Sequence, residues 1–427
     1  MKTGMPSSLW NRTFLKNFAS LSVLQVSNYI LPLIVLPYLV RVIGPEKYGL
    51  IAFAQALCQY FAVITDYGFW MSASREIAIN RDDEKKVSET FSSVIAAQFL
   101  LMSACFLVLC AMLLFIPRFR NDSLVYLFTF GTILGSIMFP NWFFMGKERM
   151  EFMAVRDILV KIVFTVLIFV FVRKTEHYIY VPIINFFGYM CVGLLSVWTL
   201  VRKFRIRVRV PRISDIVSRL KNNRHIFVSA ISLNFYFATN TFFLGIFTNN
   251  TIVGFYAAAE KIIITITQIF NPLFNAAYPY IAKLANESKE KALEKVKRIS
   301  VITIAASSAI FAVFLALSDG INLLILGPRF ADSAAISRIL SPVLVTLPAV
   351  CLLANVILVP FRLERPLSGI YVRGWILNTI ALLIVLGIFR AGAAGVALTN
   401  VTVQASLALA MLLAVKRYGV IRSQTAS

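Results

Sequence analysis

The chain has 427 residues, of which 59% are hydrophobic and only 15% are charged, and its net charge is +22. A mean hydropathy of +0.78 excludes a soluble globular protein and indicates an integral membrane protein. The positive charges are dispersed over short segments between apolar runs, a pattern that membrane topology produces by itself. We therefore expect no nucleic-acid partner.

Twelve apolar runs are long enough to cross a bilayer as helices, since a spanning helix needs about 20 mainly apolar residues. They cover residues 18–40, 48–70, 91–116, 123–145, 154–172, 178–201, 226–248, 252–275, 300–326, 336–360, 370–389 and 391–415. These runs predict an all-α polytopic membrane protein with about twelve transmembrane helices. The first run should remain as a helix, because no small-residue cleavage site follows a short apolar core.

The distribution of lysine and arginine predicts the orientation of the chain. Of the 42 cationic residues, 30 fall in segments on one side of the membrane, eight fall on the other side, and four lie within or at the ends of spans. Short loops rich in Lys and Arg stay in the cytoplasm, so both termini should be cytoplasmic. The five cysteines all lie inside predicted spans, and we expect no disulfide, metal site or cofactor.

The longest basic connection, residues 202–225, carries nine Lys/Arg residues and one Asp. It separates an N-terminal six-helix bundle, residues 1–201, from a C-terminal six-helix bundle, residues 226–427. Four of its apolar residues share one helical face: Ile213, Ile216, Val217 and Leu220. This face suits an amphipathic helix on anionic lipid, and a plain linker that only sets topology explains the charge equally well.

A weak internal repeat relates the second spans of the two halves. "GLIAFAQAL" (Gly49 to Leu57) matches "GFYAAAEKI" (Gly254 to Ile262), with Gly, Ala and Ala at identical spacing. Six spans per half is an even number, so both halves enter the membrane from the same side. This predicts a parallel repeat with the substrate path between the halves.

Polar side chains along the eighth predicted span are the strongest candidates for a substrate-facing surface. At about 100° per residue they fall within about 140° of arc. They are Glu260, Lys261, Thr265, Gln268, Asn271 and Asn275. Ionisable groups within spans are costly and point to function by default, so Lys261 is the leading candidate for a cation that meets substrate.

Other spans carry further candidates for a central substrate lumen: Gln25 and Asn28 on the first span, Gln55, Gln59 and Asp66 on the second, Lys161 on the fifth and Arg373 on the eleventh. Amides of this kind also make interhelical hydrogen bonds that have no role in transport. Lys161 equally suits a local pair with Asp157, and Arg373 equally suits snorkelling to the interface.

The end of the first span, "PLIVLPYLVRVIGPEKYG", combines two prolines with one arginine. Pro32 and Pro37 lack amide protons and should loosen the outer half of this helix. Arg41 at its outer end suits either a gate that guides an anionic headgroup or a simple membrane anchor.

An ordered set of segments resembles a known family. "NYILPLIVLPYLVRVIGPEKYGLIAFAQA", "DYGFWMSASREIA", "NWFFMGKERM", "TFFLGIFTNNTIVGFYAAAEKI" and "LGPRFADSAAISRILSP" together resemble lipid-linked O-antigen flippases of the Wzx type. These belong to the exporter superfamily that also contains multidrug and toxin extruders and the lipid II flippase. The resemblance is collinear from about Leu21 to Arg417.

The resemblance implies a MATE-like, V-shaped pair of six-helix bundles around a central lumen in the bacterial inner membrane. It implies a transporter, not an enzyme, that moves undecaprenyl-pyrophosphate-linked repeat units from the cytoplasmic to the periplasmic leaflet by alternating access. Cationic lumen residues of the family map onto Lys261 and, less directly, onto Arg373 and Lys161. Asn240 stands near a position that is often acidic in the superfamily, which leaves Glu260 or Asp66 to supply a carboxylate.

Two other functions are compatible with the sequence to different degrees. A cation-coupled multidrug extruder of the same superfamily would protect against small lipophilic cations, which a lysine-rich lumen should repel. A membrane glycosyltransferase normally needs carboxylates or a sizeable outer loop, and no outer loop here exceeds about ten residues. We further expect membrane lipids and possible contact with the O-antigen polymerase as partners, and a monomer.

Overall fold

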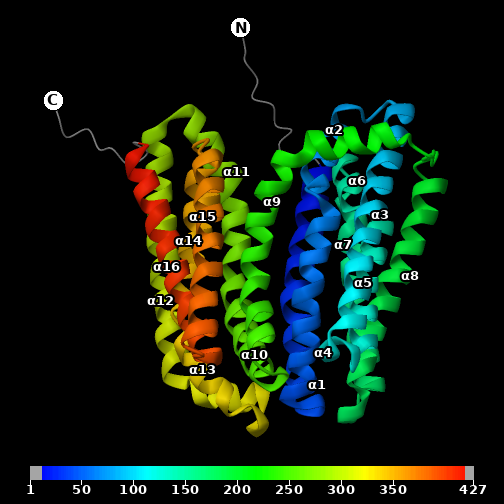
Figure 1. Cartoon of the computed structure of the whole chain (residues 1–427). Coiled ribbons are helices and arrows are strands. Elements are labelled where there is room, and N and C mark those ends of the chain that lie inside the picture. The colour runs from blue at the N-terminus through cyan, green and yellow to red at the C-terminus, as the bar shows by residue number, and fades with distance from the viewer. Residues whose placement is uncertain (1–11, 419–427) are drawn as a thin grey trace, which may run out of the picture. The chain divides into compact units, whose positions relative to one another are not determined.

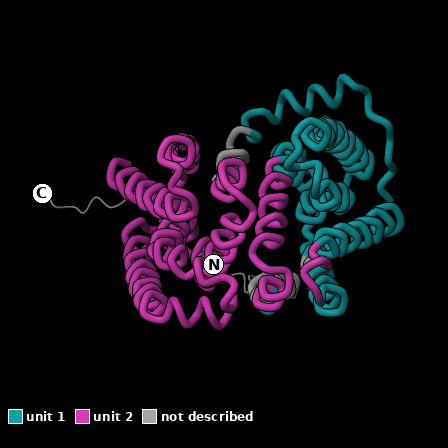
Figure 2. The backbone as a smooth tube through the Cα atoms, turned by 60° about the horizontal axis from the view of Figure 1, so that its bottom comes forward, with its two compact units in different colours: residues 1–35, 61–173, 179–228 teal, residues 36–60, 174–178, 229–427 magenta. Residues whose placement is uncertain are grey.

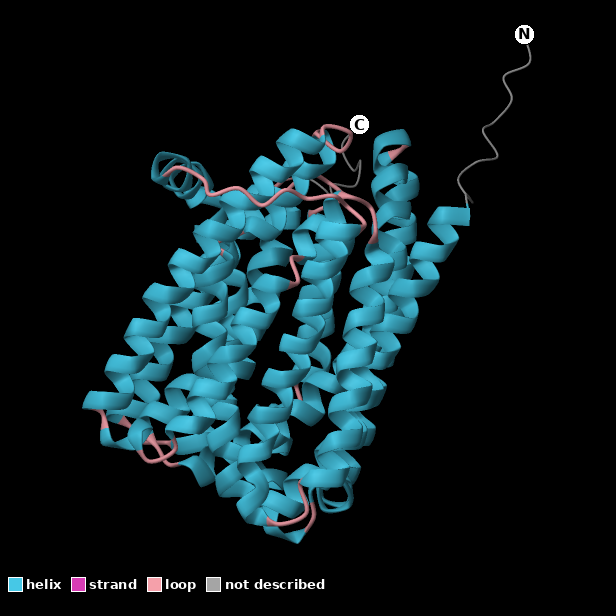
Figure 3. Ribbon diagram, turned by 90° about the vertical axis from the view of Figure 1, so that its right-hand side faces the viewer, coloured by secondary structure: helices cyan, strands magenta, loops and turns pink. Residues whose placement is uncertain are grey.

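The computed structural model describes the backbone of residues 12–418, and side chains from residue 34 onward except at 154, 156–157 and 228–237. Within this described part every regular element is a helix (Figure 3). Helices occupy all twelve ranges predicted from the apolar runs. The prediction of an all-α membrane protein is therefore confirmed.

Figure 1 shows the helices in chain order. They are α1 (Arg12–Asp66), α2 (Phe69–Ile79), α3 (Glu84–Phe115), α4 (Pro117–Arg120), α5 (Ser123–Met138), α6 (Asn141–Gly146), α7 (Met150–Phe171), α8 (Tyr180–Arg202), α9 (Ile213–Phe247), α10 (Asn250–Thr267), α11 (Asn271–Glu287), α12 (Lys289–Leu326), α13 (Asp332–Leu340), α14 (Val343–Leu352), α15 (Glu364–Leu383) and α16 (Gly392–Arg417). Short 3₁₀ turns and two π-helical segments, Leu353–Leu358 and Ile384–Ile388, complete the set.

Nine stretches of the described residues are helical, apolar and long enough to cross a membrane, and Ala238–Phe247 is a shorter apolar helix. Side chains on several of these helices are both large and apolar yet exposed, as at Leu317 and Leu324 of α12. In a bilayer such side chains face lipid.

Helix α1 contains the first predicted span and most of the second, and it is kinked at one residue. The backbone runs as helix through Pro32 and Pro37, and the non-helical dihedrals fall at Gly44, with φ 75° and ψ 173°. Glycine adopts this left-handed φ without the steric penalty that a Cβ imposes. The sharp break therefore lies at the Gly-Pro pair, not at the two prolines.

The chain forms two compact units (Figure 2). Unit 1 comprises residues 1–35, 61–173 and 179–228, and unit 2 comprises residues 36–60, 174–178 and 229–427. An aromatic core with Trp142, Phe143 and Phe144 holds α2, α3 and α6 together in unit 1. An aliphatic core around Ile281, Val356 and Met411 holds α11, α14 and α16 together in unit 2. The division predicted at residues 202–225 stays a prediction.

The two glycines matched by the internal repeat meet each other inside unit 2. A Cβ added to Gly49 would collide with the carbonyl oxygen of Asn250, and one added to Gly254 would collide with the carbonyl oxygen of Pro45. Each glycine thus lies against the residue four positions before the other glycine. This reciprocal arrangement has local two-fold symmetry, and it allows the two helices to approach at backbone distance.

Candidate functional site

The carboxylate of Glu260 on α10 is the centre of a polar network within unit 2. Tyr256, one turn earlier on α10, donates its hydroxyl to Glu260 Oε1 at 2.9 Å. The Asn400 side chain on α16 donates to the same oxygen at 3.4 Å and to the Tyr256 hydroxyl at 3.2 Å. Thr241 on α9 donates to Oε2 at 3.3 Å. Three helices therefore supply donors to one carboxylate.

The network continues through amide side chains of unit 2. Gln404 donates to Asn400 Oδ1 at 3.1 Å and accepts a hydrogen bond from Thr346 at 3.2 Å. A cavity of about 10 Å³, lined in part by Glu260, Asn240 and Asn400, adjoins it. This volume holds about one water molecule.

Asn240 accepts a hydrogen bond at 3.0 Å from Asn378 on α15, and its side chain also hydrogen-bonds to Glu260. Both asparagines are buried. The position that is often acidic in the resembled superfamily is thus occupied here by a paired amide.

Sequence reasoning identified Glu260 and Asn240 but missed Tyr256, Asn400 and Gln404. A signal existed for Tyr256, because a side chain four residues before Glu260 lies on the same helical face. No such signal connects α10 to α16.

Lys261 is exposed on unit 2, whereas Glu260 beside it is half-buried. Neighbouring residues on a helix project about 100° apart, which explains how one side chain enters the unit 2 core and the other leaves it. Lys261 lies about 16 Å along α10, roughly halfway across a hydrocarbon core.

The remaining polar residues of this predicted span do not lie on one continuous α-helix. Helix α10 ends at Thr267, a 3₁₀ turn covers Gln268–Phe270, and α11 begins at Asn271. A 3₁₀ turn has 3.0 residues per turn, so the α-helical rotation of about 100° per residue does not hold across it. Gln268 and Asn271 are half-buried and Asn275 is exposed.

The candidates on the second span fall in both units. Gln55 and Gln59 are exposed on the part of α1 that belongs to unit 2. Asp66 is half-buried in unit 1, where its carboxylate accepts backbone hydrogen bonds from Gly68 and Trp70. The side chains of Gln25 and Asn28 on the first span lie outside the described residues.

The two other cationic candidates, Lys161 and Arg373, lie in different units. Lys161 on α7 is half-buried in unit 1. Arg373 on α15 is exposed, and its Nε donates to the Gly369 carbonyl at 3.0 Å, one turn earlier on the same helix. Their proposed contact with substrate stays a prediction.

Arg41 has a structural role within unit 2. Its guanidinium donates to the carbonyl oxygen of Leu324, in the last turn of α12, and its side chain lies against Gly327, which ends that helix. A cation at a helix C-terminus satisfies free carbonyl groups and opposes the negative end of the helix dipole. The role of Arg41 as a gate or as a membrane anchor stays a prediction.

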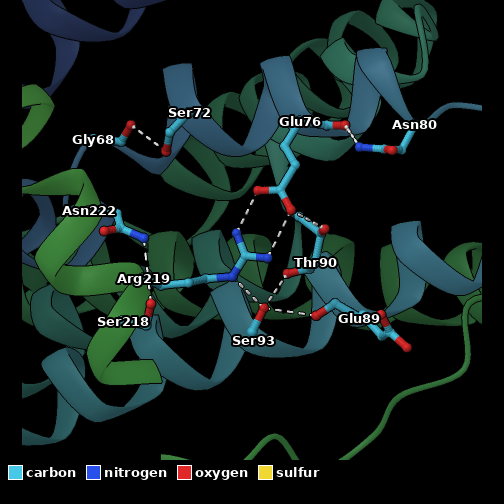
Figure 4. A network of polar contacts seen from close by, with 10 residues as sticks. All are labelled: Gly68, Ser72, Glu76, Asn80, Glu89, Thr90, Ser93, Ser218, Arg219 and Asn222. Atoms are coloured by element: carbon cyan, nitrogen blue, oxygen red, sulfur yellow. Dashed lines mark hydrogen bonds and ion pairs between the residues drawn. The ribbon is translucent and has the colours of Figure 1, made fainter. Parts of the chain in front are cut away.

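A second polar cluster fixes the basic linker to unit 1 (Figure 4). Arg219 on the first turns of α9 donates to both carboxylate oxygens of Glu76 on α2, at 2.7 and 3.0 Å. Its Nε donates to Ser93 on α3, and Thr90 also donates to Glu76 at 2.6 Å. Asn223 donates its side-chain amide to the Tyr67 carbonyl.

The extended part of the linker, residues 203–212, follows α3. The amide groups of Arg207 and Arg209 donate to the hydroxyls of Ser88 and Ser92, at 3.3 and 3.0 Å. A polar pocket of about 880 Å³ lies between this segment and α2, α3 and α9. The amphipathic face predicted for the linker is divided: Ile216 and Leu220 pack on the unit 1 core, while Ile213 and Val217 are exposed.

Among the side chains that the structure describes, no three His, Cys, Asp or Glu residues lie close enough together to hold a metal ion.

Comparisons with known proteins place the chain in a family. Residues 14–285 match the family described as "Polysaccharide biosynthesis protein". The chain is 26% identical to a candidate O-antigen transporter of Escherichia coli (strain K12), over 94% of this chain and 96% of that protein. It is 25% identical to a candidate O-antigen transporter of Shigella dysenteriae, over 94% of this chain and all of that protein.

Solved structures with the same fold are membrane transporters. An inward-facing MATE-family multidrug resistance transporter of the MOP superfamily matches with a TM-score of 0.73 at 15% identity, over 93% of this chain and 97% of that one. The lipid II flippase MurJ in an inward closed conformation matches with a TM-score of 0.68 at 16% identity, over 95% and 87%. The chain therefore belongs to the family described as "Polysaccharide biosynthesis protein", and it shares the fold of these transporters.

Proposed function

We propose that this protein is a flippase that carries undecaprenyl-pyrophosphate-linked polysaccharide repeat units from the cytoplasmic to the periplasmic leaflet of a bacterial inner membrane. The family match and the two O-antigen transporter relatives, each aligned over 94% of the chain, support a lipid-linked saccharide as substrate. Alternating access is the mechanism we propose for it.

The observation that carries this proposal is the position of Lys261. An exposed cation about 16 Å along a membrane-spanning helix is costly unless it meets water or an anion. A pyrophosphate diester supplies that anion with about two negative charges. We infer that Lys261 binds the pyrophosphate, with the exposed Gln55 and Gln59 of the same unit available to hydrogen-bond sugar hydroxyls.

The membrane potential favours the proposed direction of transport. When a negative charge moves outward across a membrane that is negative inside, its free energy falls by about 2.3 kcal/mol per 100 mV. We assign any additional ion dependence to Glu260, because it is the carboxylate that three helices of unit 2 converge on.

Complementation tests the proposal. We expect the native protein to restore surface polysaccharide in a bacterium that lacks its own O-antigen flippase, Lys261→Arg to retain much of the activity, and Lys261→Ala to lose most of it. Lys291→Ala, at an exposed lysine near the start of α12, is the matched control and should behave as wild type. Normal flipping by a correctly inserted Lys261→Ala protein would remove Lys261 from the site.

The test also separates the flippase from a multidrug extruder. Cells that express the native protein are exposed to small lipophilic cations in parallel with the polysaccharide assay. Protection against the cations without restored polysaccharide would replace the proposed function with drug export.

A further inference from the structure

The linker arch, defined here as residues 205–217, belongs to unit 1 and follows shortly after the end of a lipid-facing helix. The preceding helix α8 exposes Leu194, Leu195 and Trp198 and ends at Arg202. Large exposed apolar side chains on a spanning helix face hydrocarbon, so the end of α8 marks the boundary between hydrocarbon and headgroups. The arch therefore begins in the headgroup region.

Four aliphatic side chains of the arch are more than half exposed. Val208 is 67% exposed, Val210 98%, Ile213 80% and Val217 55%. Ile206, just before them, is buried in the unit 1 core. A run of exposed aliphatic side chains outside the membrane spans marks a surface that binds another protein or a membrane.

Cationic side chains accompany these aliphatic residues. Arg205, Arg207 and Arg212 are exposed. Arg209 of the arch is paired with Glu89 at 3.6 Å, and Arg219, two residues beyond the arch, is paired with Glu76 at 2.7 Å. Exposed arginines beside exposed aliphatic residues match an anionic phospholipid leaflet, with phosphate at the headgroup level and acyl chains below it.

The arch is held in shape before any lipid binds. Backbone hydrogen bonds from Arg207 and Arg209 to α3 fix its extended part, and Ile216 and Leu220 fix the first turns of α9 on the unit 1 core. A surface that is already ordered loses less conformational entropy on binding than a flexible linker does.

We propose that the linker arch docks on an anionic phospholipid surface, inserting Val208, Val210, Ile213 and Val217 among the acyl chains while Arg205, Arg207 and Arg212 contact lipid phosphates. This assigns the basic linker a binding role in addition to its part in topology. It is independent of the saccharide that the transporter carries.

The test places a polarity-sensitive fluorophore on the arch of the full-length protein in nanodiscs. In a background without the five native cysteines, Val210→Cys carries the label, and Asp82→Cys, in the exposed turn between α2 and α3, carries it as the matched control. The discs contain either phosphatidylcholine alone or equal parts of phosphatidylcholine and phosphatidylglycerol. Lipids brominated on their acyl chains serve as quenchers.

We expect the label at position 210 to shift to the blue and to be quenched severalfold more than the label at 82 in the anionic discs. Replacing Arg205, Arg207 and Arg212 by Gln should reduce the difference between the two disc types. Equal quenching at 210 and 82 in anionic discs would overturn the proposal, and equal insertion at 210 in both disc types would overturn its anionic part.

Hydrogen exchange of the unmodified protein gives a second test that needs no substitution. The amides of the arch should exchange more slowly in anionic discs than in zwitterionic discs, while those of the α2–α3 turn should not change. Identical exchange of the arch in both disc types would contradict docking on anionic lipid.

Discussion

Arg219 clasps Glu76 with both terminal nitrogens of its guanidinium, at 2.7 and 3.0 Å, and so joins the first turns of α9 to α2 in unit 1. The Arg219 side chain is 24% exposed and that of Glu76 is 39% exposed. A bidentate pair of this kind is among the stronger polar contacts in proteins, and partial exposure reduces its contribution. Here it holds the linker in place.

Glu76→Gln should loosen the linker without disrupting the helices that it joins. The amide keeps the shape of the carboxylate but loses the charge, and we expect a loss of about 1 to 2 kcal/mol in linker docking. Limited trypsin digestion checks this, because the freed segment contains four arginines, Arg205, Arg207, Arg209 and Arg212. Cleavage there should become faster than in wild type.

The matched control for this experiment is Glu148→Gln. Glu148 pairs with Arg81 at 2.5 Å in the same unit, but their side chains are 62% and 36% exposed. An exposed pair contributes less than about 1 kcal/mol. Equal sensitivity of the linker to trypsin in both variants would show that the Arg219 clasp does not hold it.

Gly49→Ala should severely reduce the amount of folded protein. The added methyl group would collide with backbone atoms of Asn250 and Gly254, which cannot rotate away. Overpacking of this kind costs about 1 to 3 kcal/mol or more. The control is Gly320→Ala on α12, where a Cβ has no heavy atom within 4 Å. Thermal unfolding in detergent that ranked the two variants equally would contradict the close approach.

Removing the Glu260 carboxylate should destabilise unit 2. In Glu260→Ala the hydroxyls of Tyr256 and Thr241 lose their acceptor, and unsatisfied buried polar groups cost about 1 to 3 kcal/mol each. Glu260→Gln retains an acceptor oxygen and should lose less. Unfolding temperatures of the two variants and the wild type give the comparison, and equal values for Ala and Gln would exclude a structural role for these hydrogen bonds.

The Asn240–Asn378 contact should contribute little to stability. Interhelical hydrogen bonds in membranes average about 0.6 kcal/mol in double-mutant cycles. A cycle with Asn240→Ala, Asn378→Ala and the double variant should yield a coupling energy near that value. A coupling several times larger would indicate that the pair does more than join α9 to α15.

The positions of the helices were predictable from the sequence. Long apolar runs predicted the ranges that the described helices occupy, because a bilayer admits few alternatives for such segments. The repeat that matched Gly49 with Gly254 also identified the two residues that meet at a helix crossing. Small residues at such crossings are a local signal that a sequence can display.

Long-range side-chain pairs were not predictable. Arg219 and Glu76 are separated by 143 positions, and nothing in the pattern of either segment selects the other. The uniform helical geometry that put Asn275 on the same face as Lys261 does not hold across the 3₁₀ turn at Gln268. The contact of Arg41 with the Leu324 carbonyl was equally unpredictable, because the two residues are 283 positions apart.

Lowering the pH should release the turn that precedes α7. The hydrogen bond from Arg81 holds the pKa of Glu148 below its ordinary value of 4.5. The contribution of this pair to stability is therefore fully present above pH 4.5, and it is lost as the pH falls through the lower pKa of the folded state. Hydrogen exchange of residues 146–150, corrected for the intrinsic rate and compared at about pH 6 and about pH 3, should reveal the added opening. Glu148→Gln should remove this pH dependence, and an equal change in that variant would assign the effect to another group.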